Sequence, residues 1–215
     1  MSNTRIVTAR LYGFIDTAYL GKRDPAEVAR AMTDGGVEVI QVRAKNMTRS
    51  QRVALGLAVL GAARPRNVPV IVNDDIDAAA EINADGVHLG QQDWAAIPRE
   101  KRVERLANMR IVGVSTHSLE QALAAERNGA TYIGVGPIFK TATKPGAKPV
   151  GIELIRQVEE HVAIPFFAIG GITLDNLGEV LAAGATQVAV VSAILTAPDV
   201  QQTAAAFKQR LMTSK

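Results

Sequence analysis

The 215-residue chain contains no cysteine, which excludes disulfides, thiolate metal ligands and cysteine nucleophiles, so the fold does not depend on a redox compartment. Aromatic residues make up only 4% of the chain, and they do not alternate with basic residues in the pattern that stacks nucleic-acid bases. The net charge of +3 comes from scattered residues, and the densest charged stretch, residues 98–106, includes acids and predicts a solvated helix face. We therefore expect no nucleic-acid partner.

Long apolar runs are also missing. No stretch approaches the roughly 18 consecutive apolar residues of a membrane span, and the N-terminal residues lack the basic, apolar and small-residue order of a signal peptide. We expect a soluble cytoplasmic protein with no membrane partner. No linker rich in Pro, Gly or Ser divides the chain, and its 47% hydrophobic content is enough for one large core, which predicts a single domain over residues 1–215.

Short runs rich in Val and Ile alternate with longer segments of helical period. Eight runs are candidate strands, at residues 10–16, 37–43, 68–74, 85–90, 110–115, 131–136, 164–170 and 186–192. The segments 24–36, 118–130 and 173–185 carry apolar residues at i, i+3 and i+4, begin with Asp, Ser or Thr caps and end near Gly. These features predict amphipathic helices between strands that are buried on both faces.

Such an alternation is typical of a parallel sheet built from right-handed βαβ units. Eight units in about 200 residues favour a closed barrel over an open sheet, and no dinucleotide-binding fingerprint follows the first strand. The predicted fold class is therefore α/β, a single-domain (β/α)8 TIM barrel. Active sites of such barrels lie where strands end and βα loops begin, so the residues at these ends are the candidates for function.

The second predicted strand ends in the polar sequence "QVRAK". Strand alternation sends Gln41, Arg43 and Lys45 to one side, toward the mouth of the barrel, while Val42 and Ala44 face the other way. Two cations there favour an anionic ligand. The alternative is that Arg43 and Lys45 pair with neighbouring acids or reach solvent, because an inward charge without a partner is costly.

Asn73 and Asp74 end the third strand, and Asp93 follows the fourth. Two carboxylates without a histidine or cysteine signature indicate a hard, oxygen-preferring cation, for which Mg²⁺ held by one or two carboxylates and substrate phosphates is the expected pattern. The alternative for Asp93 is a role in helix capping or in a turn.

The seventh and eighth strands end in "AIGGI" and "VVSAI". Barrel enzymes often bind phosphate after these two strands, through backbone N–H groups that glycine lets approach closely, so Gly171, Val191 and Ser192 are candidates. The alternative for Gly170 and Gly171 is a tight turn.

The sixth strand leads into "TATKPGAKPVG", residues 141–151. Thr141 and Thr143 offer hydroxyls and Lys144 offers a compact cation, and the position after a strand predicts a loop that closes over a phosphorylated substrate. The alternative is a surface loop without a role.

The histidines carry less information. His88 lies within a strand, and we interpret it as a hydrogen-bonded interior residue rather than a ligand. His117 follows Ser115 by two positions, so both side chains can face the site if the backbone is extended.

Together these motifs resemble thiamine-phosphate synthases. The resemblance covers nearly the whole chain, and its most discriminating parts are "QVRAK", "HLGQQD" and "GPIFKTATK". It implies a transferase of thiamine biosynthesis that joins a hydroxymethylpyrimidine diphosphate to a thiazole phosphate, giving thiamine monophosphate and pyrophosphate. It also implies a dissociative reaction, in which pyrophosphate leaves before the thiazole nitrogen captures the pyrimidine cation.

The resemblance also implies residue roles. Gln41, Arg43, Lys45 and Asn73 would bind the pyrimidine diphosphate, Asp74 and Asp93 would ligate Mg²⁺, and Ser115 would lie beside the pyrimidine. The residues implied to hold the thiazole phosphate are Thr141, Thr143, Gly171, Val191 and Ser192, while Lys144 would reach the diphosphate. Arg43, Lys45, Ser115 and Lys144 are the predicted catalytic residues. The expected partners are thus small phosphorylated substrates, and the sequence leaves the oligomeric state open, a homo-oligomer included.

One position departs from the pattern. The family usually has Asn-Asp-Arg where this chain has "NDD", so Asp75 places an anion beside a proposed metal ligand. If Asp75 faces the site, charge balance and pyrophosphate binding come into question. Two alternatives remain open: a thiazole tautomerase-like barrel with His117 as its acid-base group, and a non-catalytic regulatory relative, favoured only if Asp75 has spoiled the metal site.

Overall fold

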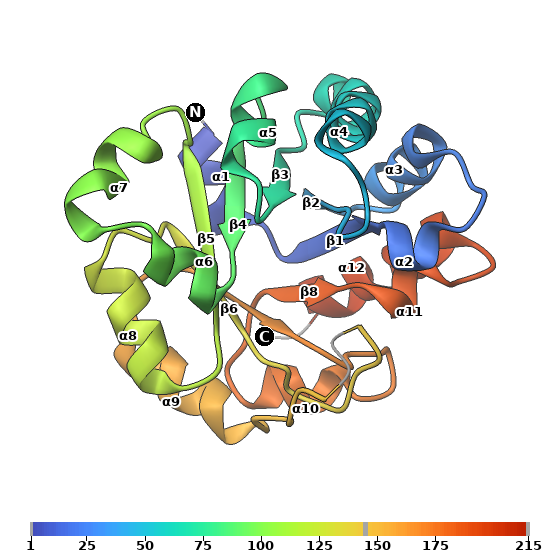
Figure 1. Ribbon diagram of the computed structural model, residues 1–215. Helices are drawn as coiled ribbons and strands as arrows, with labels where there is room; N and C mark the ends of the chain where they lie inside the picture. The colour runs from blue at the N-terminus through green and yellow to red at the C-terminus, as the bar shows by residue number, and fades with distance from the viewer. Residues whose placement is uncertain (1, 144–145, 214–215) are drawn as a thin grey trace.

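A closed parallel barrel forms the centre of the molecule, as the sequence predicts (Figure 1). The computed structural model describes residues 2–143 and 146–213. Eight strands pair in sequence order, and β1 closes the barrel against β8. The strands are β1 (Leu11–Asp16), β2 (Val39–Arg43), β3 (Val70–Asn73), β4 (Gly86–Leu89), β5 (Ile111–Thr116), β6 (Tyr132–Val135), β7 (Phe166–Ile169) and β8 (Val188–Val190). Each lies inside a predicted run, except that β5 extends one residue beyond its run to Thr116, so the expected fold class is confirmed.

Helices surround the barrel and connect its strands (Figure 1). None of those in the described part of the chain is long and apolar enough to cross a membrane. They are α1 (Ser2–Thr8), α2 (Thr17–Leu20), α3 (Pro25–Asp34), α4 (Arg49–Ala63), the 3-10 turn η1 (Arg64–Arg66), α5 (Ile76–Glu81), α6 (Gln91–Ala96), α7 (Arg99–Arg105), α8 (Leu119–Arg127), α9 (Glu153–His161), α10 (Leu177–Ala182), α11 (Ser192–Leu195) and α12 (Val200–Thr213).

The helix ends follow local chemistry. Asp24 caps α3 by accepting the N–H groups of residues 26 and 27, and Ser118 caps α8 by accepting that of residue 121. Gly36, Gly129 and Gly184, each just before a strand, have φ of 93°, 90° and 105°, a left-handed conformation that glycine adopts without strain. The caps and glycine stops predicted from sequence are therefore confirmed for α3 and α8.

The predicted start of the helix over 173–185 is wrong. Its first helical residue is Leu177, because the Asn176 side chain organises the preceding residues as a turn. Asn176 Oδ1 accepts the Thr173 N–H at 2.8 Å, and its Nδ2 donates to the Gly171 carbonyl at 2.9 Å. An asparagine that bonds to nearby backbone in this way competes with helix formation, so Thr173 is no cap.

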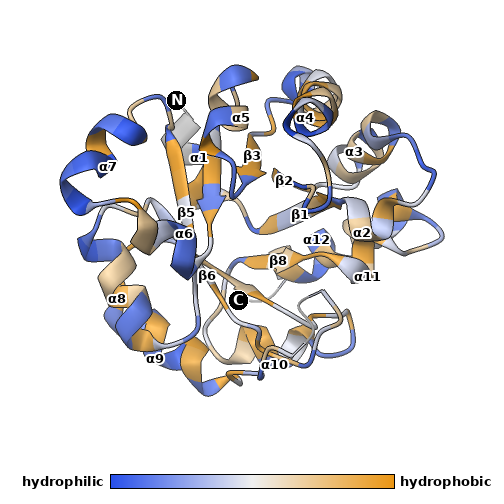
Figure 2. Ribbon diagram, in the orientation of Figure 1, coloured by the Kyte–Doolittle hydropathy of each residue, from blue (hydrophilic) through white to orange (hydrophobic). Residues whose placement is uncertain are grey.

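Two apolar cores lie on the two faces of the sheet. The outer core packs strand residues such as Ile40, Val87 and Ile133 against the inner faces of the helices, which carry their polar residues outward (Figure 2). α7, within the predicted charged stretch, buries no residue, as expected. The inner core fills the barrel with side chains from alternate strand positions: Tyr12, Phe14, Val39, Ile71, Ile111, Tyr132, Phe167, Ala189 and Val191.

The amino-terminal end of the barrel is closed by α1, which the sequence did not predict. Ile6 is fully buried and belongs to the inner core. The buried Gln187 amide donates to the carbonyls of Ile6 at 3.0 Å and Ala9 at 2.5 Å, which ties this segment to the start of β8. Since this segment covers the amino-terminal end, the carboxyl-terminal rim is the end at which the inside of the barrel is accessible.

Gly113 makes room for an aromatic ring inside the barrel. It pairs with Tyr132 on the neighbouring strand, and a Cβ at position 113 would lie 2.2 Å from Tyr132 Cζ. Tyr132 is fully buried and its ring packs edge-on against Phe167 with centroids 5.7 Å apart, so it cannot move aside easily.

We expect Gly113→Ala to lower the free energy of unfolding by about 1–3 kcal/mol, because the added methyl overpacks the core. Denaturant unfolding of both proteins measures this. Gly61→Ala is the matched control: a Cβ there meets nothing within 4 Å, and the position lies in α4. Its stability should be unchanged or higher by up to about 1 kcal/mol, since alanine favours a helix. Equal stabilities of the two variants would contradict the proposed role of Gly113.

Candidate active site

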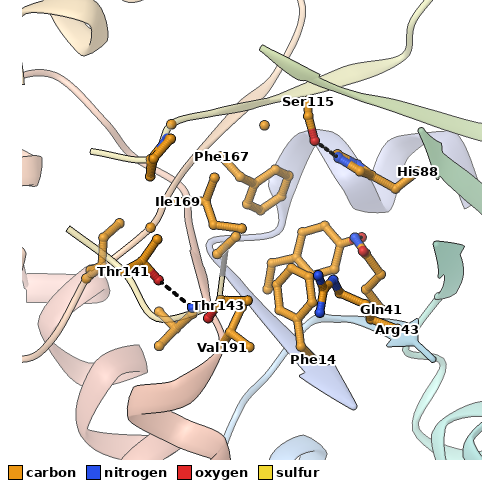
Figure 3. A pocket seen from close by; sticks show the side chains of 18 of the residues that line it. Phe14, Gln41, Arg43, His88, Ser115, Thr141, Thr143, Phe167, Ile169 and Val191 are labelled. Atoms are coloured by element: carbon orange, nitrogen blue, oxygen red, sulfur yellow. Dashed lines mark hydrogen bonds between the residues drawn. The ribbon is translucent and has the colours of Figure 1, made fainter. Parts of the chain in front are cut away.

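A cavity opens at the carboxyl-terminal ends of the strands and draws its lining from most of the barrel (Figure 3). Gln41, Arg43, His88 and Ser115 lie on one side in this view, and Thr141 lies across the cavity from them, with Phe167 and Ile169 between. The sequence-predicted residues that line it are Gln41, Arg43, Asn73, Ser115, Thr141, Thr143, Gly171, Val191 and Ser192. Residues spread over about 150 positions of the chain therefore meet in one place, as expected from the strand ends.

Asp74, Asp93 and Lys45 do not line this cavity but lie close to one another beside it. Desolvation raises the pKa of Asp74, the charge of Asp93 raises it further, and the charge of Lys45 opposes the increase. Asp74 accepts hydrogen bonds from Asn73 Nδ2 at 2.5 Å and from the Gly90 N–H at 3.3 Å, and Asn73 itself lines the cavity. The two carboxylates thus form an acidic pair next to the cavity wall.

Arg43 is paired with an acid that the sequence analysis did not single out. Its Nη1 lies 2.6 Å from Asp16 Oδ2, with the side chains 16% and 2% exposed. The strand register places Asp16 opposite Arg43, and Asp16 Oδ1 also accepts the Ala18 N–H at the start of α2. The alternative of pairing with a neighbouring acid therefore holds for Arg43, which nevertheless lines the cavity, whereas Lys45 is exposed.

Polar side chains also meet inside the cavity floor. Gln41 Nε2 donates to the Tyr12 hydroxyl at 2.9 Å, and this hydroxyl lies 2.9 Å from that of Tyr132. His88 bridges the Tyr132 hydroxyl, 2.8 Å from its Nδ1, and Ser115 Oγ, 2.9 Å from its Nε2. Burial lowers the pKa of His88 to about 4 and raises the pKa of both tyrosines. His88 is therefore a neutral, hydrogen-bonded interior residue, as interpreted from the sequence.

His117 lines the cavity as expected from its spacing to Ser115. Its Nδ1 contacts the Gly136 carbonyl oxygen, which can only accept, so Nδ1 carries a proton. The backbone N–H of His117 donates to Gln121 Oε1 at 2.7 Å, which anchors the residue at the start of α8.

The loop after β6 packs against the glycine turn after β7. Gly170 and Gly171 have φ of 101° and 67°, and a Cβ at position 171 would lie 2.5 Å from the Lys140 carbonyl oxygen. The Phe139 N–H donates to the Gly170 carbonyl at 2.9 Å. The tight-turn alternative therefore describes the backbone of this glycine pair, which also lets the two loops approach each other at the cavity.

The two threonines of that loop face the cavity. The Thr143 N–H donates to Thr141 Oγ1 at 3.2 Å (Figure 3). The Thr143 hydroxyl also lies 3.2 Å from that of Tyr19. Lys144, predicted to be catalytic, lies outside the described residues. Ser192 begins α11, a helix of four residues that precedes the longer α12.

Known proteins are similar to this chain over most of its length. The family model described as thiamine monophosphate synthase matches residues 11–194. The chain belongs to the thiamine monophosphate synthase family. It is 44% identical over 216 aligned residues to the thiamine-phosphate synthase of Chloroflexus aurantiacus, covering 100% of this chain and 97% of the relative. It is 48% identical over 178 residues to that of Thermus thermophilus, covering 82% and 84%.

A solved structure of the same family has the same fold. The thiamine phosphate pyrophosphorylase of Pyrococcus furiosus is 35% identical to this chain and superposes with a TM-score of 0.86, covering 96% of this chain and 97% of the other. The resemblance stated from the motifs is thus confirmed for the family and for the fold.

Asp75, the departure from the usual family pattern, does not line the cavity. Its Oδ1 accepts the Ala78 N–H at 2.9 Å and so caps α5, and its Oδ2 lies 3.0 Å from Arg52 Nε. The extra carboxylate is therefore directed toward its own helix and balanced by an arginine. This geometry removes the reason for expecting a spoiled metal site.

Sequence reasoning missed Tyr12 and Tyr132, which line the cavity, and Asp16, which pairs with the cavity residue Arg43. Asp16 ends the first strand, so the rule applied to the other strand ends would have found it. Tyr12 and Phe14 precede it at alternate positions, which indicates an inward-facing row. Tyr132 has no comparable local signal, because its polar partners come from β1 and β4.

We expect Asp16→Asn to lower the free energy of unfolding by about 1–3 kcal/mol, because the partly buried guanidinium of Arg43 loses its charge partner. Denaturant unfolding measures the change. Glu81→Gln is the matched control, since Glu81 pairs with Arg49 at 2.9 Å while both side chains are about half exposed. Its loss should be below about 1 kcal/mol. Equal losses in the two variants would show that the Asp16–Arg43 pair behaves as a surface pair.

Proposed function

We propose that this chain joins a hydroxymethylpyrimidine diphosphate to a thiazole phosphate, releasing thiamine monophosphate and pyrophosphate. The observation that carries the proposal is the meeting, in one cavity, of the polar strand ends that resemble the synthase pattern. Family membership across residues 11–194 supports it. Both substrates are small and phosphorylated, which agrees with a cavity that has polar side chains and an aromatic floor.

The two sides of the cavity divide the substrates between them. On one side Gln41, Arg43 and Ser115 would bind the pyrimidine diphosphate, with Asn73 and Lys45 beside them. On the other side, hydroxyls and backbone groups would hold the thiazole phosphate, namely those of Thr141, Thr143, Gly171, Val191 and Ser192. Phe167 and Ile169 lie between the two groups, where flat apolar rings would pack.

Asp74 and Asp93 fit a magnesium ion. Desolvation raises the pKa of Asp74 and the charge of Asp93 raises it further, which supports a cation beside the pair. Among the described residues no group of three or more His, Cys, Asp or Glu is placed to hold a metal ion, and the proposed site has two carboxylates. Mg²⁺ commonly binds in this way and completes its shell with water and substrate phosphate. When bound, the cation would neutralise part of the charge on the diphosphate.

The reaction needs no nucleophile from the protein. The bond between the pyrimidine methylene carbon and the diphosphate oxygen breaks with its electron pair on pyrophosphate, and the thiazole nitrogen lone pair then forms the new C–N bond. Arg43, held by Asp16, presents a fixed charge to the departing group, and Lys45 supplies another beside Asp74. The buried, aromatic floor of the cavity limits the access of water, which could otherwise react with the pyrimidine cation before the thiazole nitrogen does.

We expect purified protein supplied with both substrates and Mg²⁺ to form thiamine monophosphate and pyrophosphate in equal amounts. Chromatography of the products and a coupled pyrophosphate assay measure both. Omission of the thiazole phosphate is the control, and it should abolish thiamine monophosphate formation. Isomerisation of a thiazole carboxylate phosphate without any coupling would instead support the tautomerase alternative based on His117.

Asp93→Ala should lower kcat by at least about two orders of magnitude, because a metal ligand that stabilises the departing charge is lost. Steady-state kinetics at saturating Mg²⁺ measures this. Asp77→Ala is the matched control, since Asp77 is an exposed aspartate on α5 that pairs with Arg105 at 2.6 Å and does not line the cavity. Its rate should stay close to that of the unmodified protein. A normal rate for Asp93→Ala would remove Asp93 from the metal site.

A further inference from the structure

An unbroken row of hydrogen-bonding side chains crosses the barrel from Gln41 to Ser115. It contains, in order, Gln41 from β2, Tyr12 from β1, Tyr132 from β6, His88 from β4 and Ser115 from β5. Its four contacts measure 2.8–2.9 Å. Gln41, Tyr12, Tyr132 and His88 are 2%, 1%, 0% and 8% exposed, so protein groups rather than bulk water satisfy these polar atoms. Figure 3 shows the end of the row, where His88 meets Ser115.

The contact between Gln41 and Tyr12 fixes the direction of hydrogen-bond donation along the row. Gln41 presents its Nε2 to the Tyr12 hydroxyl, and an amide nitrogen can only donate. Tyr12 therefore accepts from Gln41, and its own proton must go to its other neighbour, the Tyr132 hydroxyl. Burial raises the pKa of both phenols, so each keeps a proton to donate.

The direction continues through the histidine. Because the Tyr132 oxygen already accepts from Tyr12, its proton goes to His88 Nδ1, which must then be the unprotonated nitrogen of the ring. A neutral imidazole carries its single proton on the other nitrogen. His88 Nε2 consequently donates to Ser115 Oγ, 2.9 Å away.

Ser115 is the last acceptor in this row of hydrogen bonds. Its oxygen accepts from His88, so its own proton is not used within the row and is available to the cavity that Ser115 lines. We propose that Tyr12, Tyr132 and His88 are positioning residues that transmit the donor direction of Gln41 to Ser115 and orient the Ser115 hydroxyl as a hydrogen-bond donor to the ligand. If the donor and acceptor roles along the row were reversed, Ser115 would donate its proton to His88 and could only accept a hydrogen bond from the ligand.

The proposal specifies the chemistry of the ligand atom that meets Ser115. That atom must be a hydrogen-bond acceptor, such as a nitrogen with a free lone pair in an aromatic ring. A ligand with an N–H group in the same place would bind poorly, because two donors, its N–H and the Ser115 O–H, would point at each other. This consequence for the substrate rests on the proposed function, since an aminopyrimidine carries such ring nitrogens. The orientation itself is a property of the free protein.

The tautomer of His88 tests the direction without any substrate. We expect two-dimensional ¹⁵N–¹H NMR of histidine-labelled protein at neutral pH to show His88 with a protonated Nε2 and an unprotonated Nδ1. The chain has three histidines, so the spectra of His88→Gln and His161→Gln assign the signals. A protonated Nδ1 on His88 would mean that His88 donates to Tyr132 and accepts from Ser115, which is the opposite of the proposed direction, and would overturn the proposal.

Kinetics test whether the row acts through Ser115. His88→Phe and Ser115→Ala should each raise KM for the pyrimidine diphosphate by about tenfold or more, while KM for the thiazole phosphate stays close to normal. The double variant should be no worse than Ser115→Ala, because His88 has no separate effect once the hydroxyl is gone. His88→Gln should recover most of the loss, since its amide can donate from a position close to that of Nε2.

Additive losses in the double variant, or equal increases in both KM values, would show that His88 only supports the fold, and would overturn the proposal. Failure of the proposed function looks different: the unmodified protein would not couple the two substrates at all, whereas the His88 tautomer would still report the direction of the row.

Discussion

Closure of the parallel barrel is the constraint on which the rest of the structure depends. All eight strands run the same way, so their carboxyl ends share one rim, and the pleat turns every second side chain inward. Asp16 meets Arg43 because the register of β1 and β2 sets them side by side, and Asp74 approaches Asp93 because β3 and β4 are neighbours. The other end of the barrel is blocked by α1, so chemistry is confined to one rim.

Inside the barrel, the same group of side chains contributes to the packing of the inner core and to the surface that would contact a ligand. Tyr12 and Tyr132 contribute ring area to the inner core, and Tyr12 stacks on Phe14 with centroids 5.1 Å apart. Their hydroxyls need partners because an unsatisfied buried polar group costs about 1–3 kcal/mol. Those partners are Gln41 and His88, which also line the cavity. The same contacts that satisfy the core therefore hold the cavity side chains in one orientation.

Sequence patterns predicted the parts of the molecule that local chemistry decides. Alternating apolar runs, Asp and Ser caps and glycine stops act within a few residues, so the strands, α3 and α8 were predictable. The start of α10 was not, because the Asn176 side chain competes with helix formation. The partner of Arg43 depends on register, and the His88–Tyr132 contact joins β4 to β6, which are not neighbours in the sheet. The spacing of residues along one chain does not show which side chains pair across the barrel in this way.

The charges at the rim also bear on how a diphosphate could bind there. Of the described side chains discussed above, three carboxylates, Asp16, Asp74 and Asp93, stand against the two cations Arg43 and Lys45. Asp16 weakens the attraction that Arg43 exerts on an anion, and Asp74 weakens that of Lys45, without removing either. These five side chains together carry one net negative charge. A divalent cation between Asp74 and Asp93 would reverse that sign, so cation binding and diphosphate binding should favour each other.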